Sequence, residues 1–351
     1  MRKKVLLFGY SRCNFGDDMF IYMFAKRYEN IDFYIHISEE KYKKAFSEQK
    51  NIYFIDVQRN VRDIEIDKYD AFCYIGGSIF IESEYALHEA EEFSYFIKKI
   101  KKINKPFFYI TCNFGPYKTK KYLEKIRGNF SMAEGVCVRD FETYKLFKDI
   151  KSVSYAPDMV LTYPLKKGKK ENKTIGISII NLKEREKFEK KIDIYEDYIK
   201  RIIIKFAKRG YKVYLISFCE FEKDKEEIEK ITKIIPEKYI KNIEKIEYNG
   251  DIEWFIKKYS KIKYMVCTRF HSLILSILAN QKIYNLCYSN KQKNFLRDYD
   301  LCKRIDMIEN IEFETILKKY NFKRINNMKR KEIIKKAEGQ FKHFEDWIIK
   351  K

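Results

Sequence analysis

The sequence lacks the patterns that would place the protein in several large classes. Its eight cysteines, at positions 13, 73, 112, 137, 219, 267, 287 and 302, form no Cys-x-x-Cys pair. This spacing argues against a metal cluster or a disulfide framework and favours buried, reduced thiols in a cytosolic protein. The chain also has no zinc-finger spacing and no RNP-like aromatic strand, so we expect no nucleic-acid binding.

Long apolar runs are missing as well. No uninterrupted apolar stretch is long enough to cross a bilayer. The run VLLFGY near the amino terminus is too short for a signal peptide and leads directly into a polar loop. No Pro- or Ser-rich linker and no short repeat is present. We therefore expect a cytoplasmic, globular enzyme or binding protein.

The sequence is rich in apolar and basic residues. Of its 351 residues, 45% are hydrophobic and 17% aromatic, which is typical of a folded protein with two domains of ordinary size. The net charge of +22 would suit an anionic partner such as a membrane surface or a phosphorylated substrate. Most of that excess is Lys scattered through a Lys-, Ile- and Asn-rich composition typical of an AT-rich genome, so composition explains much of it.

Apolar runs of strand length alternate with helical patterns along the chain. The first half contains KVLLFGY, DFYIHI, IYFIDV, AFCYI, PFFYITC, GVCV and SVSY; the second contains TIGISII, YKVYLISF, IEYNG, KYMVCT and KIYNLCY. Strands that are apolar on both faces and alternate with helices form parallel α/β sheets. The charged run KKGKKENK at 166–173 marks a boundary. We predict two doubly wound, Rossmann-like α/β domains facing a cleft, in residues 1–165 and 172–322, followed by a basic helix at 323–351.

The segment 323–351 interleaves Lys and Arg with Ile, Phe and Trp347. Two interpretations of this pattern are open. The segment can attach the protein weakly, and in a salt-sensitive manner, to an anionic membrane. Alternatively, it is a capping helix that packs back on one domain and keeps its basic face in solvent.

Polar residues follow several of the predicted strands. In CTRFHSLILSILANQ, residues 267–281, Arg269 and His271 stand between a buried strand and a buried helix. The first N–H groups of a helix have no partner within the helix, so such a junction suits anions. Ligands of doubly wound sheets bind at this edge of the sheet. The other polar residues in equivalent positions are Asn14, Asp17, Gly76, Gly77, Ser78, Arg139 and Lys291.

With these elements in order, the sequence resembles the polysaccharide pyruvyl transferase family. The resemblance rests on an N-x-G-D loop, a glycine pair after a strand, a V-R-D, a P-D, an R-x-H and a Y-x-x-K, which here are Asn14, Gly16, Asp17, Gly76, Gly77, Arg139, Asp140, Pro157, Asp158, Arg269, His271, Tyr288 and Lys291. Many relatives carry a third Gly where this chain has Ser78, and a small apolar residue where it has Ser272. These departures leave the identity of the acceptor open.

The resemblance implies a GT-B-like fold and a transferase reaction. Family members move the enolpyruvyl group of phosphoenolpyruvate onto two hydroxyls of a sugar, form a cyclic ketal and release phosphate, in the biosynthesis of cell-surface polysaccharide. The resemblance also implies that phosphoenolpyruvate is the co-substrate and that no further cofactor and no metal are needed. The acceptor would be a glycan or a lipid-linked sugar, and a lipid-linked acceptor would bring a peripheral contact with the inner face of the membrane.

The resemblance also assigns roles to residues. Phosphoenolpyruvate carries a phosphate and a carboxylate, so Arg139, Arg269 and Lys291 are the donor-binding candidates. Arg269→Ala is then expected to abolish donor binding and to leave the fold intact. His271 is the candidate acid/base group, because histidine is the residue type best suited to proton transfer at neutral pH, with Asp17 as a second catalytic candidate. The acceptor-binding candidates are Asn14, Gly76, Gly77 and Ser78.

Other interpretations remain. Asn14 and Asp17 fit ordinary helix caps, and His271 fits a hydrogen-bonded structural residue at a helix start. The chain could be a GT-B-type glycosyltransferase that uses a nucleotide sugar and releases a nucleotide, since fold does not determine function. It could also be a non-catalytic relative, although the joint presence of Arg139, Arg269, His271 and Lys291 argues against that.

Overall fold

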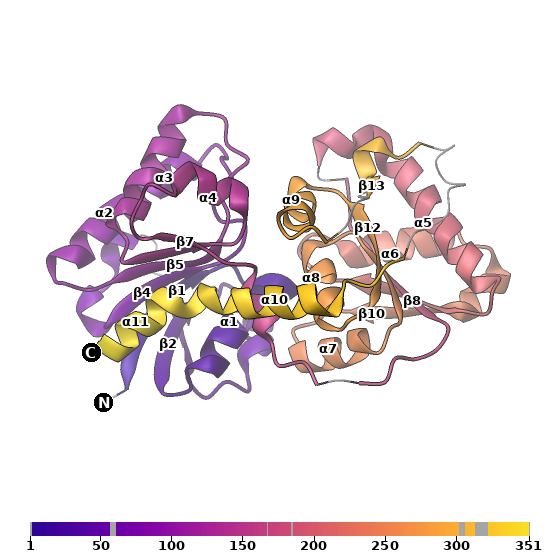
Figure 1. Cartoon of the computed structure of the whole chain (residues 1–351), viewed down its shortest axis with the longest axis horizontal. Coiled ribbons are helices and arrows are strands. Elements are labelled where there is room, and N and C mark those ends of the chain that lie inside the picture. The colour runs from indigo at the N-terminus through magenta and orange to yellow at the C-terminus, as the bar shows by residue number, and fades with distance from the viewer. Residues whose placement is uncertain are drawn as a thin grey trace. The chain divides into compact units, whose positions relative to one another are not determined.

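The computed structural model describes residues 2–56, 61–166, 168–183, 185–301, 306–312 and 322–350. The chain divides into two compact units, each with its own parallel sheet (Figure 1). The first unit comprises Met1–Ser11, Asp17–Thr162 and Ile333–Lys351, and the second comprises Arg12–Gly16 and Tyr163–Glu332. Arg12–Gly16 therefore belongs to the second unit although it lies near the amino terminus. Ile333–Lys351 belongs to the first unit although it ends the chain.

The first unit is built on seven parallel strands in the order β3-β2-β1-β4-β5-β6-β7. The strands are β1 (Lys3–Gly9), β2 (Ile31–His36), β3 (Ile52–Ile55), β4 (Ala71–Ile75), β5 (Phe107–Cys112), β6 (Gly135–Val138) and β7 (Val153–Tyr155). The helices are α1 (Phe15–Arg27), α2 (Ala86–Lys102), α3 (Lys120–Met132) and α4 (Phe141–Phe147), and the segment after β2 forms the 3-10 helix η1 (Glu40–Phe46).

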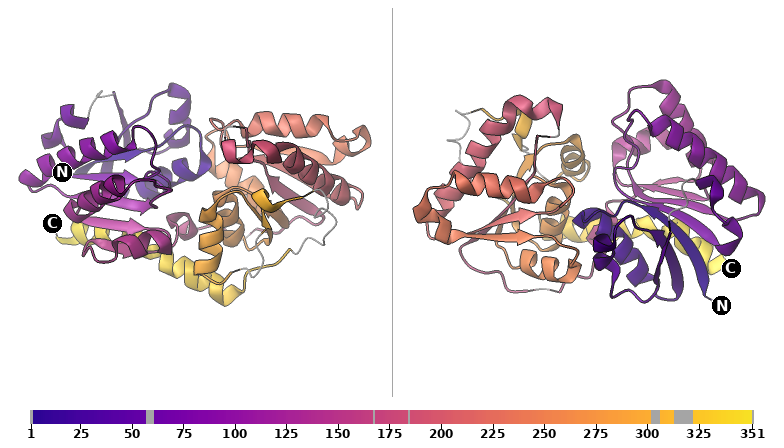
Figure 2. Two further views of the ribbon diagram at one scale, coloured as in Figure 1. Left: turned by 90° about the horizontal axis from the view of Figure 1, so that it is seen from above. Right: turned by 180° about the vertical axis from the view of Figure 1, so that it is seen from behind.

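Helices cover both faces of this sheet, as Figure 2 shows from two further sides. On one face, α2, α3 and α4 share a core with the strands, in which Phe96 and Phe130 pack among Phe107 and Tyr109. On the other face, α1 places Phe24 against Phe33. Strands buried on both sides account for the continuous apolar runs in the sequence.

We expected one helix over 323–351, but the carboxyl-terminal segment forms two. Helix α10 (Asn327–Ala337) and helix α11 (Lys342–Lys350) are separated by the 3-10 helix η9 (Glu338–Phe341). The break occurs where buried Gln340 accepts a hydrogen bond from Thr111 N (2.9 Å) and donates to Ala156 O (2.7 Å) and Pro157 O (3.1 Å). These bonds fix the segment to the carboxyl-terminal ends of β5 and β7, which a straight helix would not allow.

Most apolar side chains after this break are buried in the first unit. Phe344 packs on Phe24 and Phe108, and Trp347 packs on Phe108. Trp347 is only 6% exposed, whereas Ile349 is 82% exposed. The segment therefore covers one face of the sheet, as the capping interpretation predicts, and Trp347 is not available for insertion into a membrane.

The second unit repeats the architecture with six parallel strands in the order β10-β9-β8-β11-β12-β13. The strands are β8 (Thr174–Ser178), β9 (Lys212–Ser217), β10 (Ile243–Glu247), β11 (Tyr264–Cys267), β12 (Lys282–Cys287) and β13 (Asp306–Met307). The helices are α5 (Ile192–Ala207), α6 (Asp224–Lys233), α7 (Ile252–Ser260), α8 (Phe270–Leu278) and α9 (Asn290–Asp298). Helices α5 and α6 form a core with β8 and β9, in which Ile199 and Ile228 accompany Ile177 and Leu215.

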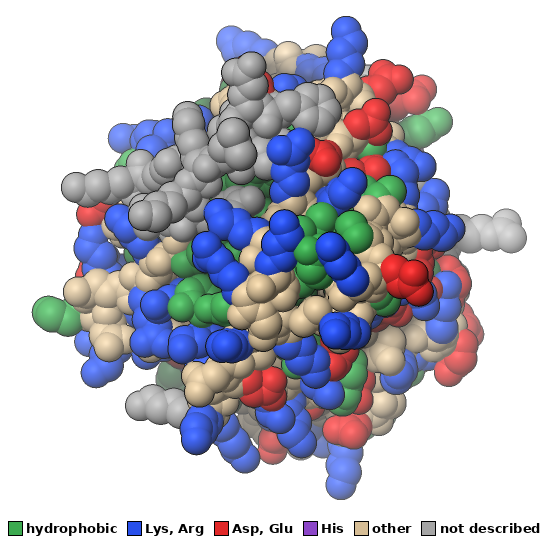
Figure 3. Space-filling model, turned by 90° about the vertical axis from the view of Figure 1, so that its right-hand side faces the viewer, with side chains coloured by type: hydrophobic (Ala, Val, Ile, Leu, Met, Phe, Trp, Pro, Cys, Tyr) green, Lys and Arg blue, Asp and Glu red, His purple; other side chains and the backbone are tan. Residues whose placement is uncertain are grey.

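On the face that Figure 3 shows, basic side chains are spread among acidic and apolar ones. The last turns of α5 and the two residues after it line a groove of about 370 Å³, formed by Arg201, Ile204, Lys205, Lys208 and Arg209. Cations at the carboxyl end of a helix interact favourably with its macrodipole, which explains their position there. Among the helices of the described residues, none is long and apolar enough to cross a membrane.

Candidate functional site

Each sheet has one topological switch point, where neighbouring strands send the chain in opposite directions. In the first unit this point lies between β1 and β4, and in the second between β8 and β11. Ligands of doubly wound sheets bind beside the carboxyl ends of these strands. Several of the predicted residues lie in the loops or first helical turns at these points: Asn14 after β1, Gly76, Gly77 and Ser78 after β4, and Arg269 and His271 after β11.

In the first unit, the structure brings Gly77, Ser78 and Arg139 together. Arg139 donates from Nε and Nη2 to Asn113 Oδ1 (3.2 and 2.9 Å) and from Nη1 to Asp158 Oδ2 (2.8 Å), and its Nη2 also lies 3.4 Å from Ser78 Oγ. Arg139 is 6% exposed and Asp158 is fully buried. The guanidinium is thus engaged within its own unit, and its charge is balanced by Asp158.

The packing of neighbouring side chains explains why positions 76 and 77 are glycines. A Cβ on Gly77 would lie 2.3 to 2.5 Å from the guanidinium of Arg139, and one on Gly76 would lie 2.7 Å from Ile79 Cγ2. Both positions therefore need glycine so that neighbouring side chains can approach the backbone. Their predicted part in acceptor binding stays a prediction.

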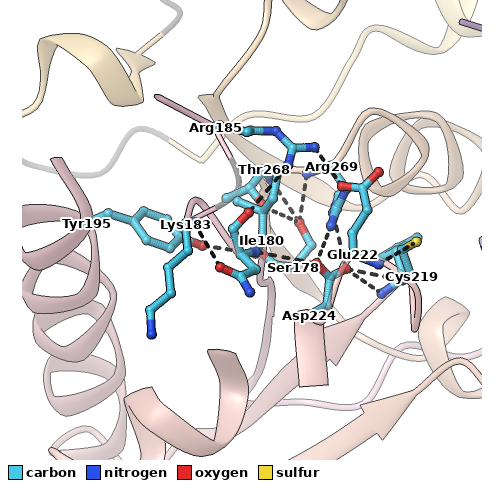
Figure 4. Close-up of polar contacts among 12 residues, drawn as sticks. Ser178, Ile180, Lys183, Arg185, Tyr195, Cys219, Glu222, Asp224, Thr268 and Arg269 are labelled. Carbon is cyan, nitrogen blue, oxygen red and sulfur yellow. Dashed lines mark hydrogen bonds and ion pairs between the residues drawn. The ribbon is translucent and has the colours of Figure 1, made fainter. Parts of the chain in front are cut away.

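In the second unit, Arg269 is the N-cap residue of α8; it is buried and forms ion pairs with two carboxylates, Asp224 and the partly exposed Glu222 (Figure 4). Its Nε and Nη2 donate to Asp224, with a distance of 3.1 Å from Nε, and its Nη1 donates to Glu222. Asp224 is fully buried and also accepts from the backbone of Phe218 and Cys219. Because Arg269 neutralises a buried carboxylate, we expect Arg269→Ala to destabilise the fold, in contrast to the expectation from the sequence.

The electrostatics of this cluster follow from burial and the arginines. Burial raises the pKa of Asp224, and the charge of Arg269 opposes that rise. At Glu222 burial also disfavours the ionised form, but Arg269 and Arg185 outweigh it and lower the pKa to about 2. Glu222 is therefore ionised at any pH at which the protein would work.

Arg185, Glu222, Asp224 and Asn113 were not predicted from the sequence. Arg185 lies in the loop after β8, and its Nη2 donates to Glu222 Oε2 at 2.6 Å. In the sequence it stands in the run KEREKFEK, which has the pattern of a solvated surface. Only its tertiary contact with Glu222 distinguishes it from the neighbouring charges.

The loop Arg12–Gly16 brings the amino-terminal motif to His271. Phe15 N donates to Phe218 O (2.9 Å), and Asn14 forms an isolated antiparallel bridge with Cys219. A Cβ on Gly16 would lie 1.8 Å from Nδ1 of His271, so the imidazole packs directly against the glycine backbone. Asn14 and Gly16 of the N-x-G-D motif thus lie beside the R-x-H motif in the second unit.

The remaining candidates lie in the first turns of helices. Asp17 is the first residue of α1 that belongs to the first unit, and it is half-buried. Its neighbour Asp18 is fully buried and accepts from Ser11 Oγ (2.8 Å), which is a structural role. Lys291, in the first turn of α9, is half-buried. Among the described residues, no three His, Cys, Asp or Glu side chains are grouped as metal ligands.

A second buried carboxylate pair lies between α5 and α6. Glu196 and Glu227 are 6% and 3% exposed, and Lys230 forms an ion pair with Glu196. Burial, and then the charge of Glu196, raise the pKa of Glu227 to about 7, while Lys230 and Lys183 oppose the rise. Glu227 is therefore protonated in the folded protein at a pH where it is ionised in the unfolded chain.

This shift makes stability depend on pH. An acid whose pKa is raised by folding destabilises the folded state as the pH rises from its unfolded value of about 4.3 through its folded value. Glu227→Gln keeps a hydrogen-bond donor for Glu196 and should raise the unfolding free energy by about 2 kcal/mol at pH 8, and much less at pH 5. Urea denaturation at both values measures the effect. Glu226→Gln, on the exposed side of the same turn, is the control, and an equal gain in both variants would contradict the prediction.

Comparisons with known proteins agree with this fold. The family model described as polysaccharide pyruvyl transferase matches residues 14–290. No curated protein sequence matches the chain. Among solved structures, UDP-GlcNAc 2-epimerase from Neisseria meningitidis bound to UDP-GlcNAc is 12% identical, with a TM-score of 0.56 over 95% of this chain and 98% of that one.

Two further structures have the same architecture. A putative UDP-N-acetylglucosamine 2-epimerase from Listeria monocytogenes is 10% identical, with a TM-score of 0.56 over 99% of this chain and 98% of that one. Anabaena Alr3699/HepE, in complex with UDP and glucose, is 10% identical, with a TM-score of 0.52 over 98% and 96%. At such identities the likeness concerns the fold, and the predicted GT-B-like class with two α/β units is confirmed.

Proposed function

Because this chain belongs to the polysaccharide pyruvyl transferase family, we propose that it transfers the enolpyruvyl group of phosphoenolpyruvate to two hydroxyls of a sugar. The observation that carries the proposal is the position of His271, in the first turn of α8 beside the switch point of the second sheet. A helix start at this edge favours an anionic ligand. The acceptor is a glycan or a lipid-linked sugar destined for a cell-surface polysaccharide, and the reaction takes place in the cytoplasm.

The reaction needs two proton movements that a side chain can assist. One sugar hydroxyl adds to the central carbon of the enolpyruvyl group while the methylene carbon gains a proton and becomes a methyl group. The second hydroxyl then displaces phosphate from the same carbon and closes the ketal. One hydroxyl proton is thus balanced by the new C–H bond, and the other leaves with phosphate. A positioned imidazole can both accept and deliver such protons, and His271 is our candidate for this role.

The test is a binding measurement followed by a product assay. Phosphoenolpyruvate should raise the unfolding temperature of the purified protein, because a ligand that binds only the folded state stabilises it. Incubation with phosphoenolpyruvate and candidate glycans should release phosphate and add the mass of a pyruvyl ketal to the glycan. A thermal shift with UDP- or GDP-sugars, and none with phosphoenolpyruvate, would favour a nucleotide-sugar glycosyltransferase instead.

A further inference from the structure

The arginine of the R-x-H motif has little of its guanidinium left for a ligand. All three of its nitrogens donate to Asp224 or Glu222. The side chain of Arg269 is 7% exposed. A substrate anion at this edge would have to displace carboxylates that already accept from Arg269. Its role in the structure is to hold Glu222 and Asp224 in place.

Arg185 is the second guanidinium of the same cluster, and it is more accessible. It shares Glu222 with Arg269, but its side chain is 24% exposed. Its guanidinium carbon lies 5.1 Å from the centre of the Tyr288 ring, which supports one face of the planar group. Nη1 makes only a long contact of 3.5 Å with Asn181 O. Arg185 is thus held by Glu222 and Tyr288, and Figure 4 shows its guanidinium beside Glu222. Among the described residues, its nitrogens have no further hydrogen-bond partner than Glu222 and Asn181.

The position of Arg185 relative to the sheet is also that of a ligand-binding residue. It lies in the loop after β8, and Arg269 follows β11, so the two residues come from the strands that flank the switch point. The carboxyl ends of such a strand pair are where doubly wound sheets bind ligands. Arg185 therefore stands where the ligand is expected on topological grounds alone.

The charges around Arg185 nearly cancel. Arg185 and Arg269 balance Glu222 and Asp224. Lys183 and Lys187 are exposed, and Glu184 and Glu186 offset them in the sequence. Lys187 also reaches the backbone oxygen of Tyr288 at 3.5 Å and lies 3.9 Å from the carboxylate of Glu309. The attraction for an anion therefore rests on the partly exposed guanidinium of Arg185 itself and not on an excess of positive charge in its segment.

We propose that Arg185 is the guanidinium that contacts the phosphate or carboxylate of the anionic substrate, and that Glu222 holds it in position. The identity of that substrate as phosphoenolpyruvate rests on the proposed function. The planar, always charged guanidinium can donate two parallel hydrogen bonds to either group, which an ammonium cannot. Tyr288, from the Y-x-x-K motif, acts in this site as the support for Arg185.

The test compares Arg185→Gln and Arg185→Lys with the wild type. Arg185→Gln should weaken phosphoenolpyruvate binding, measured by calorimetry, by roughly 10- to 100-fold, the effect of losing a charge-assisted hydrogen bond. Arg185→Lys should recover part of that loss. In the product assay KM for phosphoenolpyruvate should rise more than kcat falls. Arg201→Gln is the matched control, because Arg201 also pairs with one carboxylate, Asp197 (2.6 Å), but belongs to α5.

The outcomes separate this proposal from the proposed function. Unchanged affinity in Arg185→Gln, with a wild type that binds phosphoenolpyruvate, would overturn the role of Arg185. Binding without ketal formation would count against the pyruvyl transfer and leave the Arg185 comparison intact. If the wild type does not bind phosphoenolpyruvate, titration with inorganic phosphate and with UDP takes its place. The proposal would also be overturned if the wild type and Arg185→Gln bound each of these ligands with equal affinity, or if the wild type bound none of them.

Discussion

Arg269→Ala is expected to lower the unfolding free energy by about 3 to 5 kcal/mol, the usual effect of removing one partner of a buried ion pair. The variant leaves the fully buried Asp224 without its guanidinium, and Glu222 loses one of its two arginines. Desolvation then acts on Asp224 without the attraction that compensates it. Thermal and urea denaturation measure the loss, and a wild-type midpoint would show that the cluster does not contribute as the structure indicates.

Two controls separate the ion pair from a general effect of losing an arginine. Arg201→Ala removes a guanidinium from an exposed pair with Asp197 and should change stability by less than about 1 kcal/mol. In the double variant Arg269→Met with Asp224→Leu, no buried charge is left without its partner at these two positions. It should lose less stability than Arg269→Ala, because exchanging a buried ion pair for apolar residues is often nearly neutral.

His271→Gln is expected to lower turnover by roughly two to four orders of magnitude, with phosphoenolpyruvate affinity changed far less than in Arg185→Gln. An amide keeps the polarity and approximate size of the ring but cannot exchange a proton. Single-turnover ketal formation and calorimetric binding measure the two effects separately. If His271→Gln retained near-full activity, His271 would be a structural residue of α8, and Asp17 would become the candidate acid.

Gly16→Ala offers an independent probe of the same imidazole. The added methyl group would lie 1.8 Å from Nδ1 of His271, so the ring or the loop must move. Turnover should fall while Arg185 and its contacts are unaffected. Gly128→Ala is the matched control, because a Cβ there meets no atom within 4 Å and its helix belongs to the first unit. Full activity of Gly16→Ala would mean that the position of His271 is not critical.

Much of the fold could be predicted from the sequence because the signals are local. Runs such as PFFYITC and YKVYLISF are apolar on both faces, and β5 and β9 formed there as parallel strands. Short or weakly patterned elements were harder to find. β10 is Ile243–Glu247, whereas the predicted strand was IEYNG, and neither the two-residue β13 nor α9 was predicted individually. Such elements depend on neighbours supplied by the rest of the unit.

The sequence by itself determined the two parallel α/β units and the order of motifs that identifies the family. Only the tertiary structure decided what the charged residues of those motifs do. Arg139 is balanced by Asp158, 19 positions away, and Arg269 is engaged by Asp224 and Glu222, 45 and 47 positions away. Hydrophobic periodicity is set between residues close in the chain. The balance of a buried charge depends on which loops the strand order brings together, so Arg185 could be distinguished from other surface charges only in the folded protein.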